Sequence, residues 1–311
     1  MHFKPAYYYK LLVSLVFLLA AASVFAADFS LEQVADGVYV HRGVHEDLDD
    51  GYHGDISNIG FIIGSKGVAV IDSGGSLKTG QRLRAALREI TALPILYVIN
   101  THIHPDHIFG NAAFLADQPQ YIGHEKLANA MELRKPAYLK QGQQLLHDDF
   151  AGSDIIKPTV SVAQSLVLDL GQRKLLLQAY PNAHTNTDLT VFDETSATLW
   201  TGDLLFIERT PSLDGDIKGW LKALDQLQQL KNIKQAVPGH GPVTRDFSSA
   251  LNHEARYLNL LVEDIRAAIK QGKTMEQTMD SAAQAESGNW QLFNAVNRRN
   301  INLLYPALEW E

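Results

Sequence analysis

Residues 101–107 read Thr-His-Ile-His-Pro-Asp-His, and this run constrains the chain more than any other part of its sequence. It follows the apolar, strand-like stretch Ile95–Ile99. At the end of a strand His102 and His104 point the same way, because alternate side chains share a face. Pro105 favours a break at this point, so the run is expected to leave a strand and enter a turn.

Asp106 and His107 are adjacent, so both can serve one metal ion only if the chain turns there. Neutral imidazole nitrogen and carboxylate oxygen are ligands that Zn²⁺ and other borderline divalent metals accept. The alternative is a polar loop with chance histidines, and matching residues downstream argue against it. Three of these follow apolar runs that meet turn residues: His184, Asp203 and His240. Strand ends that feed loops are where α/β proteins gather functional groups.

The order of these seven residues resembles the ligand pattern of the metallo-β-lactamase superfamily, whose two-metal members fill all seven positions. The resemblance extends from about Val34 to Pro242. Carried over position by position, it assigns the first metal to His102, His104 and His184. It assigns the second metal to Asp106, His107 and His240, with Asp203 as the bridge. The fold that it implies is α/β, an αββα sandwich of two mixed sheets between outer helices.

Within that superfamily the chain is most similar to the quinoprotein relay system zinc metallohydrolases, which are exported bacterial proteins. The stretches that carry this narrower resemblance are residues 37–41, 58–64, 106–111, 183–189 and 211–215. It implies a periplasmic quinoprotein system as a partner, and it supplies no substrate.

Hydrophobic periodicity agrees with the sandwich, because strand-like stretches precede helical ones in both halves of the chain. The expected strands are residues 38–41, 60–63, 68–71, 95–99, 166–170, 174–180, 189–192 and 198–201. The expected helices are residues 76–90, 108–115, 125–146 with a break near Pro136, 219–230 and 248–270. Residues 243–311 hold no usable motif and are expected to pack as helices on the second half.

The N-terminus is typical of a secretory signal. Lys4 and Lys10 form a basic region, Leu11–Ala22 is apolar, and small residues lead to a cleavage point after Ala26. We therefore expect residues 1–26 to be a signal peptide, residues 27–311 to be one mature domain, and the location to be periplasmic. An uncleaved anchor is the alternative, although the apolar run is shorter than the ~20 residues that span a bilayer.

Charge and cysteine content exclude several classes of protein. The formal net charge of −8 becomes −10 without residues 1–26, which hold two lysines and no acidic residue. Nucleic-acid binding requires a basic face, so we expect a small-molecule substrate instead. The chain has no cysteine, which excludes disulfides and the thiolate ligand that one group of metallo-β-lactamases uses.

Two polar residues near strand ends have a structural and a functional interpretation. Asp72 follows the expected strand 68–71. We expect its carboxylate to hold the turn or to orient a metal-binding imidazole, and not to bind the metal itself. His124 is expected to open a helix, outside the site.

Two segments are candidates for contact with a substrate. Tyr52 and His53 belong to an acidic loop at a position where superfamily members often carry a flap over the cleft. Arg209, Asp214 and Trp220 follow the expected bridging aspartate closely. Packing explains this second segment equally well.

The ligand set predicts hydrolysis. Two divalent ions about 3.5–4 Å apart can hold a water between them and lower its pKa toward 7. Asp106 can orient the bridging hydroxide and accept its proton, so it is the expected catalytic residue. We expect a dinuclear zinc metallohydrolase that acts on an ester, thioester or amide-like bond, with iron or manganese as alternative metals.

Three other functions fit parts of the pattern. A β-lactamase fits an exported protein, but an aspartate as the bridge favours other branches. An iron-dependent redox enzyme of the flavodiiron type has glutamate where this chain has His104, and persulfide oxidation would leave His107 and His240 superfluous. A non-catalytic metal-binding accessory protein is the third alternative, and the intact ligand set argues against it.

Overall fold

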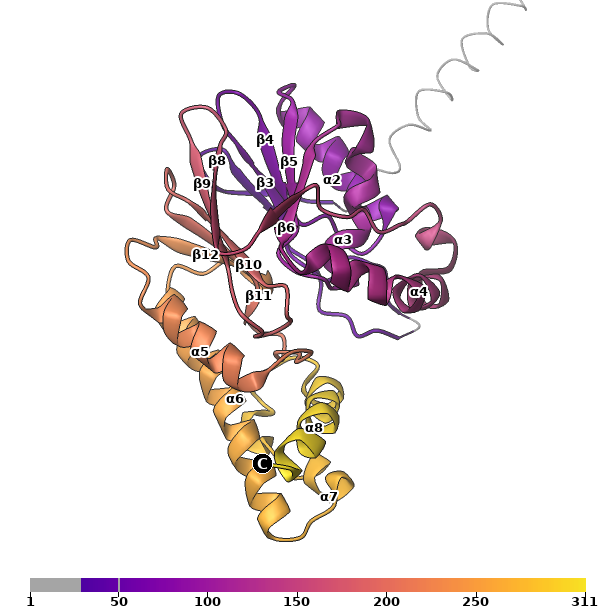
Figure 1. Cartoon of the computed structure of the whole chain (residues 1–311), viewed down its shortest axis with the longest axis vertical. Helices are drawn as coiled ribbons and strands as arrows, with labels where there is room; N and C mark the ends of the chain where they lie inside the picture. Colours follow the sequence, from indigo (N-terminus) through magenta and orange to yellow (C-terminus); the bar gives the residue numbers. More distant parts are fainter. Residues whose placement is uncertain (1–28, 50) are drawn as a thin grey trace, which may run out of the picture. The chain divides into compact units, whose positions relative to one another are not determined.

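The structure is a computed structural model that describes residues 29–49 and 51–311. The expected signal peptide, residues 1–26, lies outside the described residues, so it stays a prediction. Leu31–Glu311 forms one unit built on two β-sheets (Figure 1). In this described part, no helix combines the length and the apolar character needed to cross a membrane.

The first sheet has seven strands that follow one another in sequence order. Strands β1 to β4 pair antiparallel and β4 to β7 pair parallel, so the sheet is mixed. Its parallel part brings the carboxyl ends of neighbouring strands to one edge, which is where α/β folds hold their sites. The strands are β1 (Glu32–Ala35), β2 (Val38–His41), β3 (Ile59–Ile63), β4 (Val68–Ile71), β5 (Ile95–Ile99), β6 (Gln120–His124) and β7 (Val160–Val162).

The second sheet has five strands in the order β12-β11-β10-β9-β8. Strands β11 and β12 are parallel, and the other neighbours are antiparallel. The strands are β8 (Ser165–Asp169), β9 (Lys174–Ala179), β10 (Leu189–Asp193), β11 (Thr198–Phe206) and β12 (Gln235–His240).

Helices cover the outer face of each sheet. Figure 1 shows α2, α3 and α4 on the side of the first sheet, and α5 and α6 on the side of the second. The α-helices are α2 (Leu77–Ile90), α3 (Pro105–Ile108), α4 (Leu127–Leu146), α5 (Ile217–Gln228), α6 (Phe247–Lys270), α7 (Met275–Met279) and α8 (Phe293–Glu309). The 3₁₀ helices are η1 (Phe109–Asp117), η2 (His147–Phe150) and η3 (Gln284–Glu286).

The main hydrophobic core lies between the two sheets. Ile71 and Ile99 of the first sheet belong to the same buried cluster as Val191 and Val237 of the second. Full burial of one such side chain stabilises the fold by roughly 1.5–3 kcal/mol. A second cluster packs α5, α6 and α8 against β11. These layers confirm the expected αββα sandwich. Most of residues 243–311 form helices, as expected, joined by short turns.

Local signals set several boundaries where the sequence places them. Strands β2, β4 and β5 have the expected bounds, and helix α2 begins after Ser76. The Ser76 hydroxyl accepts a hydrogen bond from the backbone N–H of Thr79 at 3.2 Å, which satisfies a donor that the first helical turn leaves free.

Three expectations about helices were wrong. Helix α4 continues through Pro136 without a break, and burial of Leu127, Met131 and Leu146 offsets the hydrogen bond that proline removes. The expected helix 108–115 is mainly the 3₁₀ helix η1. His124 ends strand β6 instead of opening a helix.

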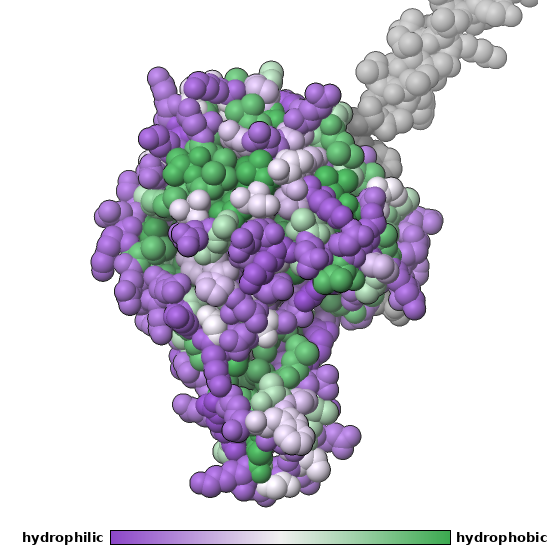
Figure 2. All heavy atoms as spheres, in the orientation of Figure 1, coloured by the Kyte–Doolittle hydropathy of each residue, from purple (hydrophilic) through white to green (hydrophobic). Residues whose placement is uncertain are grey.

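The face of the molecule in Figure 2 is predominantly hydrophilic. Hydrophobic areas interrupt it, and the largest of them lies in the upper half of the view. Large hydrophobic side chains are exposed singly at several places, such as Leu133 of α4 and Trp310 after α8. Isolated exposed side chains of this kind are ordinary on protein surfaces and indicate no particular function.

Candidate metal centre

Four of the seven expected ligands come from the short segment after β5. His102 follows the strand, and His104 keeps an extended backbone as the N-cap of α3. Pro105 is the first residue of that helix, where its missing N–H costs nothing. Asp106 and His107 lie in the helix, so the chain turns at Pro105 as the sequence predicts.

The other three come one at a time from the second half. His184 lies in the loop between β9 and β10, and His240 is the last residue of β12. Asp203 was expected just beyond a strand, but β11 continues through it to Phe206. The pairing of β11 with β12 shifts register at Gly202, whose φ is +51°. This bulge redirects the strand locally and lets Asp203 serve the site from inside a strand.

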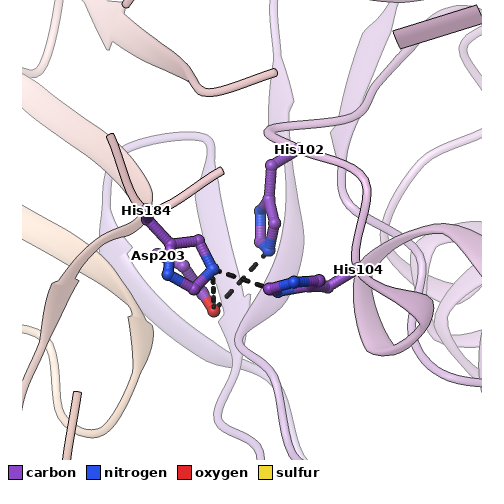
Figure 3. Close-up of side chains that lie close together, drawn as sticks. All are labelled: His102, His104, His184 and Asp203. Carbon is purple, nitrogen blue, oxygen red and sulfur yellow. Dashed lines mark hydrogen bonds and ion pairs between the residues drawn. The ribbon is translucent and has the colours of Figure 1, made fainter. Parts of the chain in front are cut away.

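The seven side chains converge. Their ligand atoms form two groups, within each of which all lie within 4.8 Å of one another. Figure 3 shows the side chains of the first group directed toward one another. The first group is His102, His104, His184 and Asp203, and the second is Asp106, His107 and His240. The structure thus brings together every residue that the sequence nominated.

Asp203 lies at the centre and contacts both groups. Its Oδ2 lies 3.6 Å from Nε2 of His102 and 3.3 Å from Nε2 of His184. The same oxygen is 3.3 Å from Nε2 of His240, and Oδ1 is 3.2 Å from Nε2 of His107. A carboxylate that contacts ligands of both groups has the position that a bridge between two ions requires.

Glycines make this close approach possible. A Cβ at Gly239 would lie 1.8 Å from Oδ1 of Asp203, so a larger residue would displace the carboxylate. A Cβ at Gly202 would lie 2.6 Å from Cβ of Thr101, next to the histidine run. The two halves of the molecule meet at the site only because these positions lack a side chain.

The donor set fits divalent metal ions. Among the described residues, Nε2 of His102, Nε2 of His107 and Oδ1 of Asp203 are buried without a hydrogen-bond partner. Buried polar atoms are normally paired, so atoms of this kind indicate a missing partner. Ligands around a tetrahedral zinc ion lie about 3.4 Å apart, given bonds of about 2.0–2.2 Å. The spacings of 3.2–3.6 Å around Asp203 match that value.

Hydrogen bonds on the outer side orient the rings of the first half. Nδ1 of His107 lies 2.8 Å from Oδ2 of Asp72, which directs Nε2 toward the other ligands. Thr101 donates its hydroxyl to the same carboxylate at 2.7 Å, and its oxygen lies 3.0 Å from Nδ1 of His102. Asp72 is therefore the orienting carboxylate that the sequence favoured over a ligand.

Two more rings are held from outside the histidine run. Nδ1 of His240 donates to the carbonyl of Ile56 at 2.7 Å, which leaves Nε2 free as a ligand. Nε2 of His104 donates to Asp214 at 3.0 Å, and Arg134 of α4 donates to the same carboxylate. The free Nδ1 of His104 then faces Nε2 of His184 at 3.0 Å.

The charged groups of the centre perturb one another strongly. Burial and the neighbouring His107 lower the pKa of His102 well below its ordinary value. Burial acts the same way on His107, but Asp203, Asp106 and Asp72 outweigh it and raise its pKa. Burial also opposes the charge of Asp203, and the surrounding histidines outweigh it and hold its pKa well below its usual range. A carboxylate that stays ionised among imidazoles is suited to cations.

A cavity of about 280 Å³ opens beside the ligands. His104 and Asp106 line it, together with Arg209 and Asp214 from the loop after β11 and Tyr52 from the acidic loop. Arg209 and Asp214 thus lie where the sequence placed a substrate contact. Asp214 also holds His104, a role that the sequence did not indicate.

Two of the expected substrate contacts do not line the cavity. His53 is exposed and pairs with Glu46. Trp220 is fully buried, with its ring 5.1 Å from that of His184, and its Nε1 donates to the carbonyl of Leu204. Packing is therefore the better of the two explanations for Trp220.

Sequence reasoning missed Glu254 of α6, which is fully buried close to the centre. It accepts a hydrogen bond from the backbone N–H of Phe206, whose ring stacks on His240 with a centroid distance of 5.0 Å. Burial raises the pKa of Glu254 well above its usual value. A lone acid on the apolar face of a long helix was the signal that could have revealed it.

Comparison with known proteins agrees with this geometry. The family model described as Metallo-beta-lactamase superfamily matches residues 53–250, a span that holds all seven candidate ligands. A linear primary-alkylsulfatase from Pseudomonas sp. (strain ATCC 19151) is 32% identical over 62 residues, which are 20% of this chain and 12% of that protein. The match therefore spans only a small part of the length of this curated relative.

Solved structures share the fold. A metallo-beta-lactamase from Pontibacter korlensis superposes with a TM-score of 0.60 at 21% identity, over 75% of this chain and 99% of that one. The stereoselective inverting sec-alkylsulfatase Pisa1 from Pseudomonas sp. gives a TM-score of 0.70 at 15% identity, over 90% of this chain and 50% of that one. At these identities the likeness concerns the fold alone, and the narrower quinoprotein relay resemblance stays a prediction. The match to the family model covers more than half of the chain, and the chain belongs to the metallo-beta-lactamase superfamily.

Proposed function

We propose that this protein is a metal-dependent hydrolase whose seven converging side chains hold two zinc ions. The observation that carries the proposal is the set of buried, unpartnered nitrogen and oxygen atoms that meet around Asp203 beside a cavity. Seven ligands exceed the four that one tetrahedral ion uses, which favours two ions. His102, His104 and His184 would hold the first ion. Asp106, His107 and His240 would hold the second, with Asp203 shared.

The remaining chemistry belongs to the side chains around the centre. When bound, a pair of zinc ions supplies Lewis acidity and a water that ionises near neutral pH. Asp72 and Asp214 keep the ligand rings in place through His107 and His104. Because the outer nitrogens of these two rings donate to carboxylates, the inner nitrogens are the ones directed toward the other ligands.

Asp106 is the proposed proton acceptor. Its carboxylate lines the cavity, and its Oδ2 lies 3.4 Å from Nε2 of His240. A proton released from the attacking water would move to a carboxylate oxygen of Asp106 and then to the leaving group. No serine, cysteine or lysine nucleophile is required for this reaction.

The bond that we propose is an ester, thioester or amide-like bond. A sulfate ester is a second candidate, because alkylsulfatases occur both as a relative in sequence and as a neighbour in structure. The buried Arg209 beside the ligands also favours an anionic substrate over a neutral one. A β-lactam, an iron-dependent redox reaction and a non-catalytic accessory role remain the rival functions.

Metal analysis combined with turnover tests this proposal. Protein purified without chelator should contain about two zinc ions per chain, from the ligand arithmetic above. It should hydrolyse at least one member of a panel of carboxylate esters, thioesters, lactams and alkyl sulfates. A chelator should abolish that activity and Zn²⁺ should restore it, whereas His102→Ala should stay inactive.

Three outcomes would contradict the proposal. A firm content of one metal ion, unchanged by added zinc, would refute the paired centre. Iron as the native metal, together with oxygen consumption, would favour the redox enzyme. Inertness of the fully loaded protein across the whole panel would favour the accessory role.

We also propose that the protein is exported to the periplasm and works beside a quinoprotein system. The signal-like residues 1–26 and the quinoprotein relay resemblance support this proposal. Mass spectrometry of cell fractions should find a mature N-terminus at Ala27 in the periplasm. An intact Met1 in the cytoplasm would refute export, and an intact Met1 in membranes would favour an anchor. Deletion of the gene should impair a periplasmic quinoprotein dehydrogenase if the functional link exists.

A further inference from the structure

The cavity beside the candidate metal centre is lined by two chemically different kinds of side chain. His104, Asp106 and the buried Arg209 are polar. Large apolar or aromatic side chains come from α4, η1 and the acidic loop and are called the apolar wall: Tyr52, Phe109, Tyr138, Leu145 and Leu146. The polar Arg134 and Gln141 of α4 also line the cavity. Cavities for small molecules combine an apolar lining with a few polar groups that fix the orientation of the ligand.

Arg209 is a buried cation to which none of the described acidic side chains is hydrogen-bonded. The residue is 5% exposed, and one of its nitrogens donates to the backbone carbonyl of Glu46 at 2.7 Å. Among the described residues, no carboxylate forms an ion pair with it and no side chain accepts from its other N–H groups. Asp106, Asp203 and Asp47 act on this guanidinium only through space, without direct contact. A buried charge is costly unless it is closely paired, so its remaining N–H groups are suited to an acidic ligand.

Arg134, which also lines the cavity, and Arg173, which is buried elsewhere, differ from Arg209 because each is paired with a carboxylate. Arg173 is as buried as Arg209, and it makes two hydrogen bonds to the carboxylate of Asp193. Arg134 also lines the cavity, but Asp214 neutralises it. Arg173 and Arg134 are thus each paired with a carboxylate, whereas Arg209, next to the ligands, has no such ion pair among the described residues.

The apolar wall continues into the hydrophobic core. Tyr52, Phe109 and Leu146 belong to one buried cluster under α4, which gives the wall a rigid backing. Phe109 also packs edge-to-face on Phe150, with ring centroids 4.8 Å apart. A wall held in this way favours an extended apolar group, because little side-chain freedom is lost when a ligand binds.

We propose that the cavity binds an amphiphilic anion, whose acidic headgroup accepts hydrogen bonds from Arg209 while its alkyl or aryl part lies along the apolar wall. As a statement about substrate class, this inference rests on the proposed hydrolase function. The headgroup chemistry is shared by sulfate and carboxylate, and both match the planar donor fork of arginine. The substrate would then be a sulfate ester itself or an ester that carries a carboxylate next to the scissile bond.

Direct binding tests the inference without turnover. Titration calorimetry would measure the affinity of octyl sulfate, octanoate and octanol, below their micellar concentrations, for the metal-loaded and the chelator-treated protein. Both anions should bind more tightly than octanol in both forms of the protein. Comparison of the affinities of octyl sulfate and octanoate identifies the preferred headgroup. Shortening octyl to hexyl sulfate should weaken binding by about tenfold, because each buried methylene contributes about 0.8 kcal/mol.

Variants locate the headgroup. Arg209→Gln should weaken binding of the preferred anion by about 10- to 100-fold, as expected when a hydrogen bond to a charged group is lost. Arg209→Lys should lose less, because it keeps the charge but not the fork. Lys66→Gln is the matched control, since Lys66 is exposed and pairs with Asp169 away from the cavity. Octanol binding should be unchanged in all three variants, which checks that the cavity is intact.

The outcomes separate this inference from the proposed function. If Arg209→Gln binds the anions as tightly as the unaltered protein, or if octanol binds as well as they do, the inference is wrong. In that case, chelator-sensitive hydrolysis of a neutral ester would leave the proposed function standing. Conversely, anion binding that depends on Arg209 in a protein without any turnover would support the inference and refute the hydrolase.

Discussion

The two halves of the sandwich supply the candidate metal centre in different ways. The first half contributes four ligands, His102, His104, Asp106 and His107, from one short segment after β5. The second half contributes His184, Asp203 and His240 from three separate places. Strand geometry and one proline organise the first set locally. The second set reaches its position only when β11, β12 and the preceding loop pack together.

The second half therefore carries the stricter packing requirements. Asp203 depends on the bulge at Gly202 and on the missing side chain of Gly239. The first half relies instead on hydrogen bonds, above all those that Asp72 makes to His107 and Thr101. We expect the centre to be most sensitive at the point where the two halves meet, and less sensitive with distance from it.

The largest effect is expected from Asp203→Asn. Asp203 contacts ligands of both groups, so its loss should weaken both metal sites and leave no turnover above that of chelated protein. The fall in zinc affinity should exceed the about 10- to 100-fold that is usual for residues behind the ligands. Zinc titration with a competing chelator would measure it, with the exposed Asp169→Asn as control. Zinc affinity within tenfold of the unaltered protein would show that Asp203 is not shared.

The next largest effect is expected from Asp106→Asn, which tests the first half. The amide can still coordinate weakly but cannot accept a proton, so activity should fall more than metal content. We expect turnover to fall about 10²- to 10⁴-fold, the usual range for general-base catalysis. Parallel measurement of zinc content and kcat on the best panel substrate would check this. A variant with both metals and near-native kcat would remove Asp106 as the proton acceptor.

The same contrast explains how much of the molecule was predictable from sequence. Strands β2, β4 and β5, helix α2 and the turn at Pro105 follow from alternation, helical spacing and capping, which are local properties. All seven candidate ligands were also nominated, because histidines and acids at strand ends are conspicuous. The sandwich itself followed from the order of the elements and from the family resemblance.

The failures concern features that tertiary packing determines. The extension of β11 through Asp203 depends on a bulge against β12, which no local pattern announces. The edge strands β1 and β7 are short and partly polar, so they lack a clear alternation. The role of Asp214 depends on contacts with His104 and Arg134, which lie far away in sequence.

An intermediate effect is expected from Asp72→Asn, which acts through His107. The amide cannot hold the ring as a carboxylate does, so zinc affinity should fall about 10- to 100-fold. Asp214→Asn acts through His104 from the second half. It should lower zinc affinity less than Asp72→Asn does, because the Asp214 side chain is 31% exposed and Asp72 is buried. Zinc titration of both variants would compare them. An equal or larger loss in Asp214→Asn would contradict the idea that burial decides the size of the effect.

The smallest effect is expected outside both sets of ligands, at Glu286 beside the C-terminal helices. Its carboxylate accepts two hydrogen bonds from Arg256, at 2.7 and 3.0 Å, and this pairing lowers the pKa of Glu286 to about 2. A lowered folded-state pKa adds stability that is fully present above the ordinary value of 4.5 and is lost as pH falls toward 2.

Glu286→Gln should therefore lower the free energy of unfolding by about 1–2 kcal/mol at pH 7. This is less than the pKa shift alone would give, because Arg256 is exposed and solvent screens the ion pair. Urea unfolding of the chelator-treated proteins at pH 7, 4 and 3 should show this difference shrinking as the pH falls. At pH 7 the variant should bind as much zinc as the unaltered protein. The exposed pair of Arg298 and Asp280 is the control, and Asp280→Asn should change stability by less than about 0.5 kcal/mol. A difference between Glu286→Gln and the unaltered protein that does not vary with pH would show that Glu286 stabilises the helices by packing and not by its charge.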